Sequence, residues 1–192
     1  MSELNEAFWT SRYKEGNTGW DLGTVSPPIK AFFETVKDKD IQILIPGCGN
    51  AHEADYLHAS GFKNVHVVDL SAEPLNALMD RVKDFPKEHV HQEDFFEHKG
   101  KYDMIVEQTM FCAIDPSLRA KYARKVQELL KDGGKLMGVL FGKEFDGGPP
   151  FGGTSKEYQT YFSPLFRKVK MEQCYNSIPP RQGSELFILL EK

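Results

Sequence analysis

Two glycines and a carboxylate stand where they could bind a ligand that contains adenosine. Gly47 and Gly49 follow the apolar run 41–45, and glycine there lets the backbone turn tightly and lets a ligand approach it. Asp69 ends the apolar run 65–69, about 20 residues further on, where a carboxylate can accept hydrogen bonds from both hydroxyls of a ribose. This spacing favours a nucleoside site over a purely structural turn.

The glycine pattern differs from that of dinucleotide and triphosphate sites. A dinucleotide fold has a third glycine where this chain has His52, and no Lys-Ser/Thr pair follows to indicate a P-loop. A cofactor without phosphate and with an amino-acid tail, such as S-adenosylmethionine, suits the loop better than NAD, so an NAD-dependent oxidoreductase is disfavoured. Asp94 and Phe95 could bind the amine and ring of adenine, or could cap a helix and fill the core.

An open α/β sheet is expected to position these residues. From Ile41 onward, β-branched runs alternate with helical patterns, which predicts a mainly parallel sheet with helices on both faces. The strand-like runs are 41–45, 65–69, 88–92, 104–106, 136–140, 168–174 and 186–190. The connection 176–183 is too short for a crossover helix, so the last two strands should pair antiparallel at one edge. In such sheets the ligand lies beyond the carboxyl ends of the strands.

Two helices have recognisable ends in the sequence. Ser71 is expected to cap a helix whose apolar face lies at positions 75, 78, 79 and 82. Asp115 and Pro116 are expected to begin another helix, which Gly133 and Gly134 would end.

Composition indicates one ordinary globular domain over residues 1–192, with 40% apolar and 27% charged residues. The net charge of −4 argues against a nucleic-acid partner. No apolar run has the length of a membrane span, and the acidic, polar start 1–6 is unlike a secretory signal. Three scattered cysteines, Cys48, Cys112 and Cys174, predict reduced thiols, and hence a cytoplasmic location.

Several motifs, in order along nearly the whole chain, carry a resemblance to a known family. They are Phe8-Trp9, Arg12-Tyr13, Thr18-Gly19-Trp20-Asp21-Leu22-Gly23, Ile45-Pro46-Gly47-Cys48-Gly49, Asp69-Leu70-Ser71, Phe111-Cys112-Ala113-Ile114-Asp115-Pro116 and Gly147-Gly148-Pro149-Pro150-Phe151. The chain resembles the thiopurine S-methyltransferase superfamily, and within it the plant and microbial halide/thiol methyltransferases. The resemblance implies a Rossmann-like class I methyltransferase fold and S-adenosylmethionine as methyl donor.

The resemblance also implies site residues. The cofactor contacts fall on Trp9, Tyr13, Trp20, Gly47, Asp69, Asp94 and Phe95. Gln108 follows the fourth strand and is expected to face the ligand, although halide/thiol relatives have a tyrosine there. Candidates for the substrate side are Phe111, Cys112, Phe151, Tyr158 and Arg181. Arg181 could attract an anionic substrate, or could be a solvated residue of a hairpin.

The first 25 residues contain both tryptophans of the chain. Trp9 and Tyr13 are four residues apart on an expected helix and share one face, and a glycine-containing turn then presents Trp20. Aromatic faces attract cations such as a sulfonium. We therefore expect residues 1–25 to form a lid segment over the cofactor, the alternative being a simple anchor on the domain.

The expected reaction is methyl transfer to a small soft nucleophile: a thiol, hydrosulfide, thiocyanate or a halide ion. Such acceptors need orientation and little acid–base help, so no catalytic acid or base is assigned. No metal site is assigned either, because His89 and His91 share a strand face without an obvious third ligand. The alternatives are a methyltransferase for larger aromatic thiols such as thiopurines, and a cofactor-binding protein without activity. We expect a monomer, with a homodimer as the alternative, and a small-molecule substrate.

Overall fold

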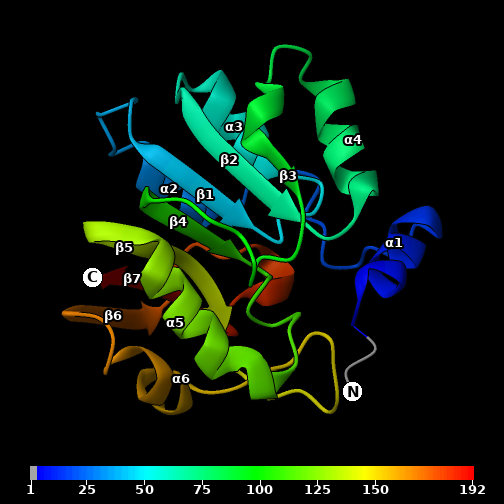
Figure 1. Ribbon diagram of the computed structural model, residues 1–192. Coiled ribbons are helices and arrows are strands. Elements are labelled where there is room, and N and C mark those ends of the chain that lie inside the picture. Colours follow the sequence, from blue (N-terminus) through cyan, green and yellow to red (C-terminus); the bar gives the residue numbers. More distant parts are fainter. Residues whose placement is uncertain (1–3) are drawn as a thin grey trace.

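One mixed sheet of seven strands forms the centre of the protein, in the order β3-β2-β1-β4-β5-β7-β6 (Figure 1). The computed structural model describes residues 4–192, so the start of the chain at Met1, Ser2 and Glu3 lies outside the described residues. The strands are β1 (Gln42–Pro46), β2 (Asn64–Asp69), β3 (Val90–Gln92), β4 (Tyr102–Gln108), β5 (Leu130–Phe141), β6 (Lys168–Gln173) and β7 (Glu185–Glu191). Each of the expected strands is confirmed.

The strand directions agree with the expected mainly parallel sheet. β1 pairs in parallel with β2 and β4, β2 with β3, and β4 with β5. β7 runs antiparallel to both of its neighbours, β5 and β6. The expected antiparallel pairing of the last two strands is therefore confirmed, and β7 lies between β5 and the outermost strand β6.

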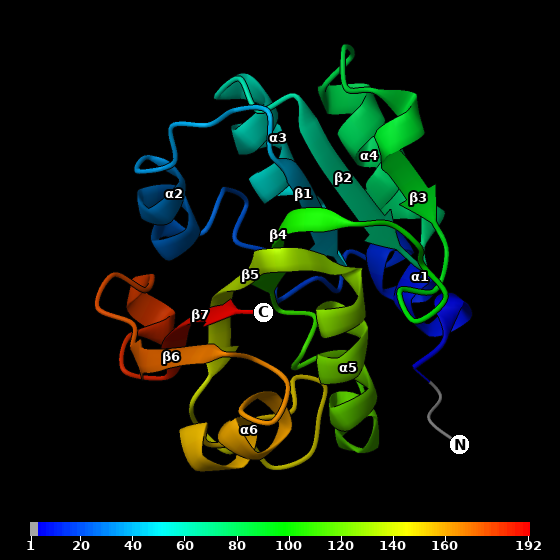
Figure 2. The same ribbon diagram turned by 60° about the vertical axis from the view of Figure 1, so that its left-hand side comes forward.

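Helices cover both faces of the sheet, as expected (Figure 2). They are α1 (Glu6–Lys14), α2 (Pro27–Phe33), α3 (His52–Ala59), α4 (Ala72–Arg81), α5 (Arg119–Leu129) and α6 (Ser155–Phe162). The helices α2, α3 and α4 pack on one face, and α5 and α6 pack on the other. Across residues 4–192, no helix has both the length and the apolar character that crossing a bilayer requires.

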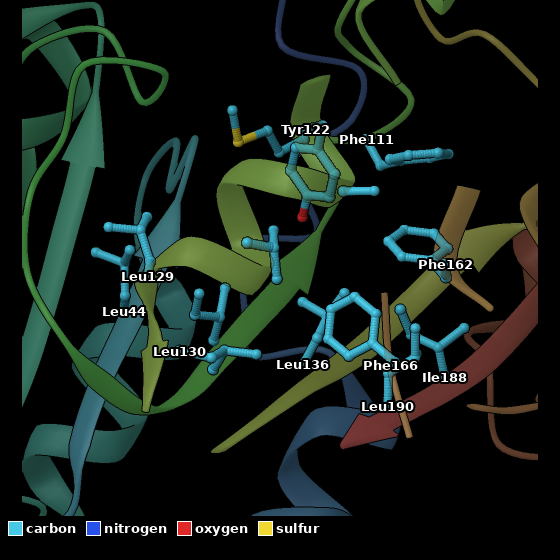
Figure 3. Packing of buried hydrophobic residues seen from close by; sticks show 14 of the residues in the cluster. Leu44, Phe111, Tyr122, Leu129, Leu130, Leu136, Phe162, Phe166, Ile188 and Leu190 are labelled. Atoms are coloured by element: carbon cyan, nitrogen blue, oxygen red, sulfur yellow. The ribbon is translucent and has the colours of Figure 1, made fainter. Parts of the chain in front are cut away.

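The core consists of two layers that the sheet separates. Successive side chains of a strand point to opposite faces, so Ile43 and Ile45 join the layer under α2, α3 and α4, whereas Leu44 joins the layer under α5. Figure 3 shows this second layer, in which Tyr122 of α5 and Phe162 of α6 pack over β4, β5 and β7. The buried residues of both layers hold the strands in place. The loops that follow the carboxyl ends of the strands therefore begin from fixed positions.

The expected helix starts are confirmed. Ser71 caps α4, and its hydroxyl accepts a hydrogen bond from the Glu73 amide. Asp115 caps a short 3-10 turn that begins with Pro116 and leads directly into α5.

The expected end of α5 at Gly133 and Gly134 is wrong. The helix ends at Leu129, and β5 begins at the next residue. The two glycines lie in β5, close to a register shift between β4 and β5, and a Cβ on Gly134 would stand 2.9 Å from the Lys131 carbonyl oxygen. Glycine is also common at irregular positions of a strand, where a side chain would collide with a nearby backbone. The glycine pair of β5 is such a case.

Candidate functional site

A cavity of about 770 Å³ lies beyond the carboxyl ends of the parallel strands, where the sequence places the ligand. Residues that follow five strands line it, and so do residues of the lid segment and of the connection before β7. Of the expected site residues, those on the cavity wall are Trp9, Tyr13, Trp20, Gly47, Asp69, Asp94, Phe95, Cys112 and Arg181. Segments far apart in the sequence thus meet at one site.

Asp69 forms part of the cavity wall at the end of β2. One carboxylate oxygen accepts a hydrogen bond from the Gly49 amide at 3.0 Å, and the other accepts one from the Ser71 amide at 2.9 Å. Burial raises the pKa of Asp69, while these hydrogen bonds act in the opposite direction. A carboxylate can accept about four hydrogen bonds, so Asp69 joins two turns and retains capacity for a ligand.

The turn after β1 requires its glycines. Gly47 and Gly49 have φ angles of +55° and +52°, in the left-handed region that glycine adopts without strain. A Cβ on Gly47 would stand 3.0 Å from the Met110 side chain, and one on Gly49 would stand 3.2 Å from the Tyr13 hydroxyl. The turn therefore allows close approach by both the loop after β4 and the lid segment.

Three aromatic residues of the lid segment form one wall of the cavity. Trp20 packs edge-to-face against Trp9 at 5.6 Å and against Tyr13 at 5.7 Å between ring centroids. Burial, together with the negative charge of Asp69, raises the pKa of Tyr13, so its hydroxyl stays protonated. The three rings are uncharged, so a cationic ligand can face them. Arg12 of the same segment also lines the cavity, with its guanidinium 5.0 Å from the centroid of the Phe8 ring.

Asp21 fastens the lid segment to the turn after β1. Its carboxylate accepts hydrogen bonds from the Asn50 side chain and the Gly23 amide, and lies 2.9 Å from the His52 Nε2 atom. Partial burial would raise the pKa of Asp21, but the hydrogen bonds from Gly23 and Asn50 and the charge of His52 outweigh it and lower that pKa. The carboxylate is therefore ionised at neutral pH.

Arg181 fastens the lid segment from the opposite side. Its Nη2 atom donates a hydrogen bond to the Trp20 carbonyl oxygen at 2.8 Å, and its Nη1 atom lies 3.4 Å from Glu185. The Arg181 side chain is only 11% exposed and lines the cavity. The alternative of a solvated hairpin residue is therefore wrong.

Asp94 and Phe95 serve the local structure and also line the cavity. Asp94 begins a turn, since its carboxylate accepts a hydrogen bond from the Phe96 amide at 2.8 Å, and it also lines the cavity. Phe95 is 3% exposed and packs against Tyr122 in the core, yet one side of it belongs to the cavity wall. Structural packing and a place at the cavity are thus compatible at both positions.

Gln108 lines a neighbouring cavity and not the main one. It lines a smaller space of about 40 Å³ that shares Trp20, Gly47 and Thr109 with the main cavity. Its Oε1 atom is buried and has no hydrogen-bond partner within residues 4–192. Thr109, the next residue, has a φ angle of +65°, and such strain in a residue other than glycine is common at functional sites.

Glu107 supports the loop after β4 from inside the core. It is 0% exposed and accepts hydrogen bonds from the Phe111 amide at 2.9 Å and from the Tyr122 hydroxyl. Burial raises its pKa to about 7. This side chain, which the sequence analysis did not single out, fixes the backbone that carries Met110 and Cys112.

Three substrate-side candidates, Phe111, Phe151 and Tyr158, are not among the residues that line the cavity. Phe111 and Tyr158 are each 1% exposed and pack edge-to-face at 5.2 Å, and the Tyr158 hydroxyl donates to the Phe141 carbonyl oxygen. Phe151 is held through its backbone, whose amide donates to the Cys112 carbonyl oxygen at 2.7 Å. A large aromatic side chain next to the core stabilises the protein more when its ring is buried than when the ring faces a cavity.

The end of β5 and the segment after it contribute cavity residues that the sequence analysis missed. Phe141, Lys143 and Phe145 line the cavity, next to Pro149 and Pro150 of the loop that follows. The rule that ligands lie just after the strands would have found these positions. Of the glycine- and proline-rich motif, Pro149 and Pro150 line the cavity and Phe151 does not.

Comparison with known proteins supplies the family. The sequence matches the thiopurine S-methyltransferase family over residues 4–188. The chain belongs to this family. A probable thiol methyltransferase 2 of Arabidopsis thaliana is 32% identical over 192 residues, which cover 96% of this chain and 84% of that protein. Thiocyanate methyltransferase 1 of Brassica oleracea is 30% identical over 189 residues, 95% of this chain and 83% of that protein.

A solved structure supports the same fold. The 1,6-didemethyltoxoflavin-N1-methyltransferase of Burkholderia thailandensis, with bound S-adenosylhomocysteine, superposes with a TM-score of 0.72 at 17% identity. The match covers 97% of this chain and 86% of that one. The Rossmann-like methyltransferase fold is thus confirmed, and the protein is an S-adenosylmethionine-dependent methyltransferase. The Asp69 carboxylate, the unpartnered Gln108 Oε1 atom and the aromatic wall fit this cofactor.

Replacing Glu107 with Gln is expected to remove a pH dependence of stability. The folded-state pKa of Glu107 is about 7, against an ordinary value of 4.5. Between these values the folded chain holds a proton that the unfolded chain releases. Stability therefore falls as pH rises through this window, by up to about 1.4 kcal/mol per pH unit, and levels off above it.

The measurement is the free energy of unfolding in urea at about pH 5 and about pH 7.5. Wild type should lose more stability between the two than Glu107→Gln does. Glu172→Gln, at an exposed position on β6, should behave like wild type. Equal losses in wild type and Glu107→Gln would contradict the assignment.

Proposed function

We propose that this protein methylates a small soft anion, namely hydrosulfide or another small thiolate, thiocyanate or a halide. The observation that carries the proposal is the division of charge in the cavity. Among the strand ends and their loops, Asp69, Glu93 and Asp94 come from the ends of β2 and β3, whereas Lys143 and Arg181 come from the segments after β5 and before β7. In the described part of the chain, Arg12 of α1 and Asp115, in the loop after β4, are the other charged residues of the wall. The acidic side suits the adenosine moiety, and the basic side suits an anionic acceptor. The names of the two plant relatives agree with such acceptors.

The cofactor residues have distinct tasks in this proposal. Bound S-adenosylmethionine supplies an electrophilic methyl group on a sulfonium. Asp69 accepts hydrogen bonds from the ribose hydroxyls, and Asp94 accepts one from the adenine amine while Phe95 covers the ring. The Gln108 Oε1 atom accepts a hydrogen bond from the ammonium group of the amino-acid tail. The aromatic wall of Trp9, Tyr13 and Trp20 faces the sulfonium.

Catalysis rests on orientation and on exclusion of water. Holding two reactants in line can contribute roughly 7–11 kcal/mol, and a soft anion becomes a better nucleophile once its water is removed. Arg181 positions the acceptor, and no general base is required because the acceptor is already ionised. Burial raises the pKa of the Cys112 thiol to about 12, so this cavity residue stays protonated and does not compete as a nucleophile.

The size of the cavity favours one second candidate, a larger aromatic thiol such as a thiopurine. A volume of about 770 Å³ lies in the upper part of the usual range for small-molecule sites, roughly 300–1,000 Å³. Room for an aromatic acceptor beside the cofactor is consistent with that volume. The acceptor scan described next distinguishes the two candidates.

Methyl-acceptor preference is the first prediction of the proposed function. Formation of S-adenosylhomocysteine should be detectable with at least one of iodide, bromide, hydrosulfide and thiocyanate, and faster than with a thiopurine. A higher kcat/KM for the thiopurine would support the second candidate. Activity with none of the five would contradict the thiol/halide assignment and point to a different methyl acceptor or to a cofactor-binding member of the family without activity.

Asp69→Asn should weaken cofactor binding without unfolding the protein. The amide keeps one acceptor oxygen for a backbone N–H but loses the charge, and a charged hydrogen bond contributes roughly 1.5–3 kcal/mol. Titration calorimetry with S-adenosylhomocysteine should therefore show a Kd about tenfold higher or more. Asp80→Asn, on the exposed side of α4, is the matched control and should bind like wild type. An unchanged Kd for Asp69→Asn would refute the ribose assignment.

The lid segment, residues 1–25, has the proposed task of closing the cofactor site. α1 contacts α4 through a hydrogen bond of 2.7 Å between the hydroxyls of Thr10 and Ser71. Beyond α1, Asp21 and Arg181 hold the segment at both sides of Trp20. These contacts support a lid that closes by docking onto side chains already in place.

Asp21→Asn tests the lid. Asparagine cannot accept a hydrogen bond from Asn50 through its amide nitrogen, so the contacts that hold Trp20 weaken. We expect a Kd for the cofactor product about tenfold higher, and lower turnover, at nearly unchanged unfolding temperature. Asp40→Asn, which loses only an exposed pair with Lys63, should match wild type. Wild-type binding and turnover in Asp21→Asn would exclude the lid role.

The buried thiols support a proposal for the cellular setting. Cys48, Cys112 and Cys174 are free and buried. Their state agrees with a reducing compartment, and we propose the cytoplasm. The proposed working unit is a monomer that acts on a small molecule.

A further inference from the structure

Four of the six histidines lie against one another at the β2–β3 edge of the sheet. The His66 ring of β2 lies 4.0 Å from the His89 ring and 5.5 Å from the His91 ring, measured between centroids. His98, in the turn after β3, lies 4.9 Å from His91. The methyl-transfer reaction uses none of these imidazoles.

Three side chains of this region converge on one point. His91, Glu93 and His98 each offer one potential ligand atom, and these atoms lie within 4.8 Å of one another. His98 Nδ1 and Glu93 Oε1 are only 2.6 Å apart. The sequence suggested His89 and His91 as a pair without a third ligand, whereas the structure joins His91 to Glu93 and His98.

We propose that His91, Glu93 and His98 bind a first-row divalent transition-metal ion such as Zn²⁺. Two imidazoles and one carboxylate are a common donor set for zinc, and they leave a further coordination position for water. His98 is buried, His91 is half-buried and Glu93 is exposed, so an ion can enter from solvent.

The surroundings of the two histidines fit a ligand role. Ligating imidazoles usually form a second hydrogen bond that fixes the ring. His98 Nε2 lies 2.7 Å from the Tyr102 hydroxyl, and His91 Nε2 lies 3.2 Å from His66 Nδ1. In His98 the Nδ1 atom, directed at Glu93, is thereby left for the ion.

A further unpaired group lies in the same cluster. His89 Nδ1 is buried and has no hydrogen-bond partner within residues 4–192. The cluster therefore holds more nitrogen donors and acceptors than its own hydrogen bonds use. Glu93 also lines the large cavity, so the ion would stand beside the acidic side of the cofactor site.

Metal binding can be tested without methyl donor or acceptor, so the result is independent of the proposed function. Protein without a histidine tag is treated with chelator, dialysed and titrated with ZnCl₂ by calorimetry. Cobalt substitution then reports the coordination geometry through the visible absorption of Co²⁺. We expect one Zn²⁺ per chain and the strong absorption of a four-coordinate Co²⁺ site.

Single substitutions identify the ligands. Glu93→Gln and His91→Gln alter side chains that are not fully buried, and each should weaken Zn²⁺ binding by more than about tenfold. His58→Gln is the matched control, because His58, on α3, pairs with Asp84 and is not one of the three converging side chains. Absence of Zn²⁺ binding in wild type, or equal binding in all four proteins, would overturn the proposal and leave a metal-free chain of hydrogen bonds from Glu93 through His98 to Tyr102.

Discussion

The hydrogen bonds of the Asp21 carboxylate hold the lid segment on the turn after β1, and most of the site depends on them. Together with the hydrogen bond from Arg181 to the Trp20 carbonyl oxygen, this attachment holds Trp20 against Tyr13, whose hydroxyl lies over Gly49. A segment that precedes every strand thus supplies one wall of a cavity whose other walls are strand ends. The large cavity is therefore a product of docking as much as of the sheet.

Two further carboxylates, both buried at strand ends, fix the loops of the site. Asp69 accepts amide hydrogen bonds from the turns on either side of it, and Glu107 accepts one from Phe111. Burial of a carboxylate costs free energy, and the raised pKa values of both groups reflect that cost. Hydrogen bonds from backbone N–H groups offset part of this free-energy cost. The same hydrogen bonds fix the direction of the backbone that donates them. The loops are thereby held in place before any ligand binds.

The inner strands could be predicted from the sequence because each contains a run of apolar residues, such as 43–45 in β1. The outer strands β3 and β6 are largely polar and give a weaker signal. The cavity could be placed from the inner strands, since the carboxyl ends of parallel strands meet. Other features depend on partners that local patterns do not reveal. In the sequence alone, Gly134 looks like the end of a helix, because its place beside β4 depends on strand pairing. The burial of Phe111 in the core likewise depends on its contact with Tyr122, which lies on α5. The contact between Arg181 and Trp20 joins residues 161 positions apart.

Arg181 connects the lid segment with the acceptor side of the cavity. A buried guanidinium needs acceptors for its hydrogen bonds, and the Trp20 carbonyl and Glu185 supply only part of them. Under the proposed function, an anion beside Arg181 accepts the remaining hydrogen bonds of the guanidinium. The guanidinium in turn replaces the water that the anion loses on binding. The same side chain then serves two purposes, because it orients the acceptor only where Trp20 is docked. Under the proposed function, closure of the lid and completion of the acceptor site are thus a single event.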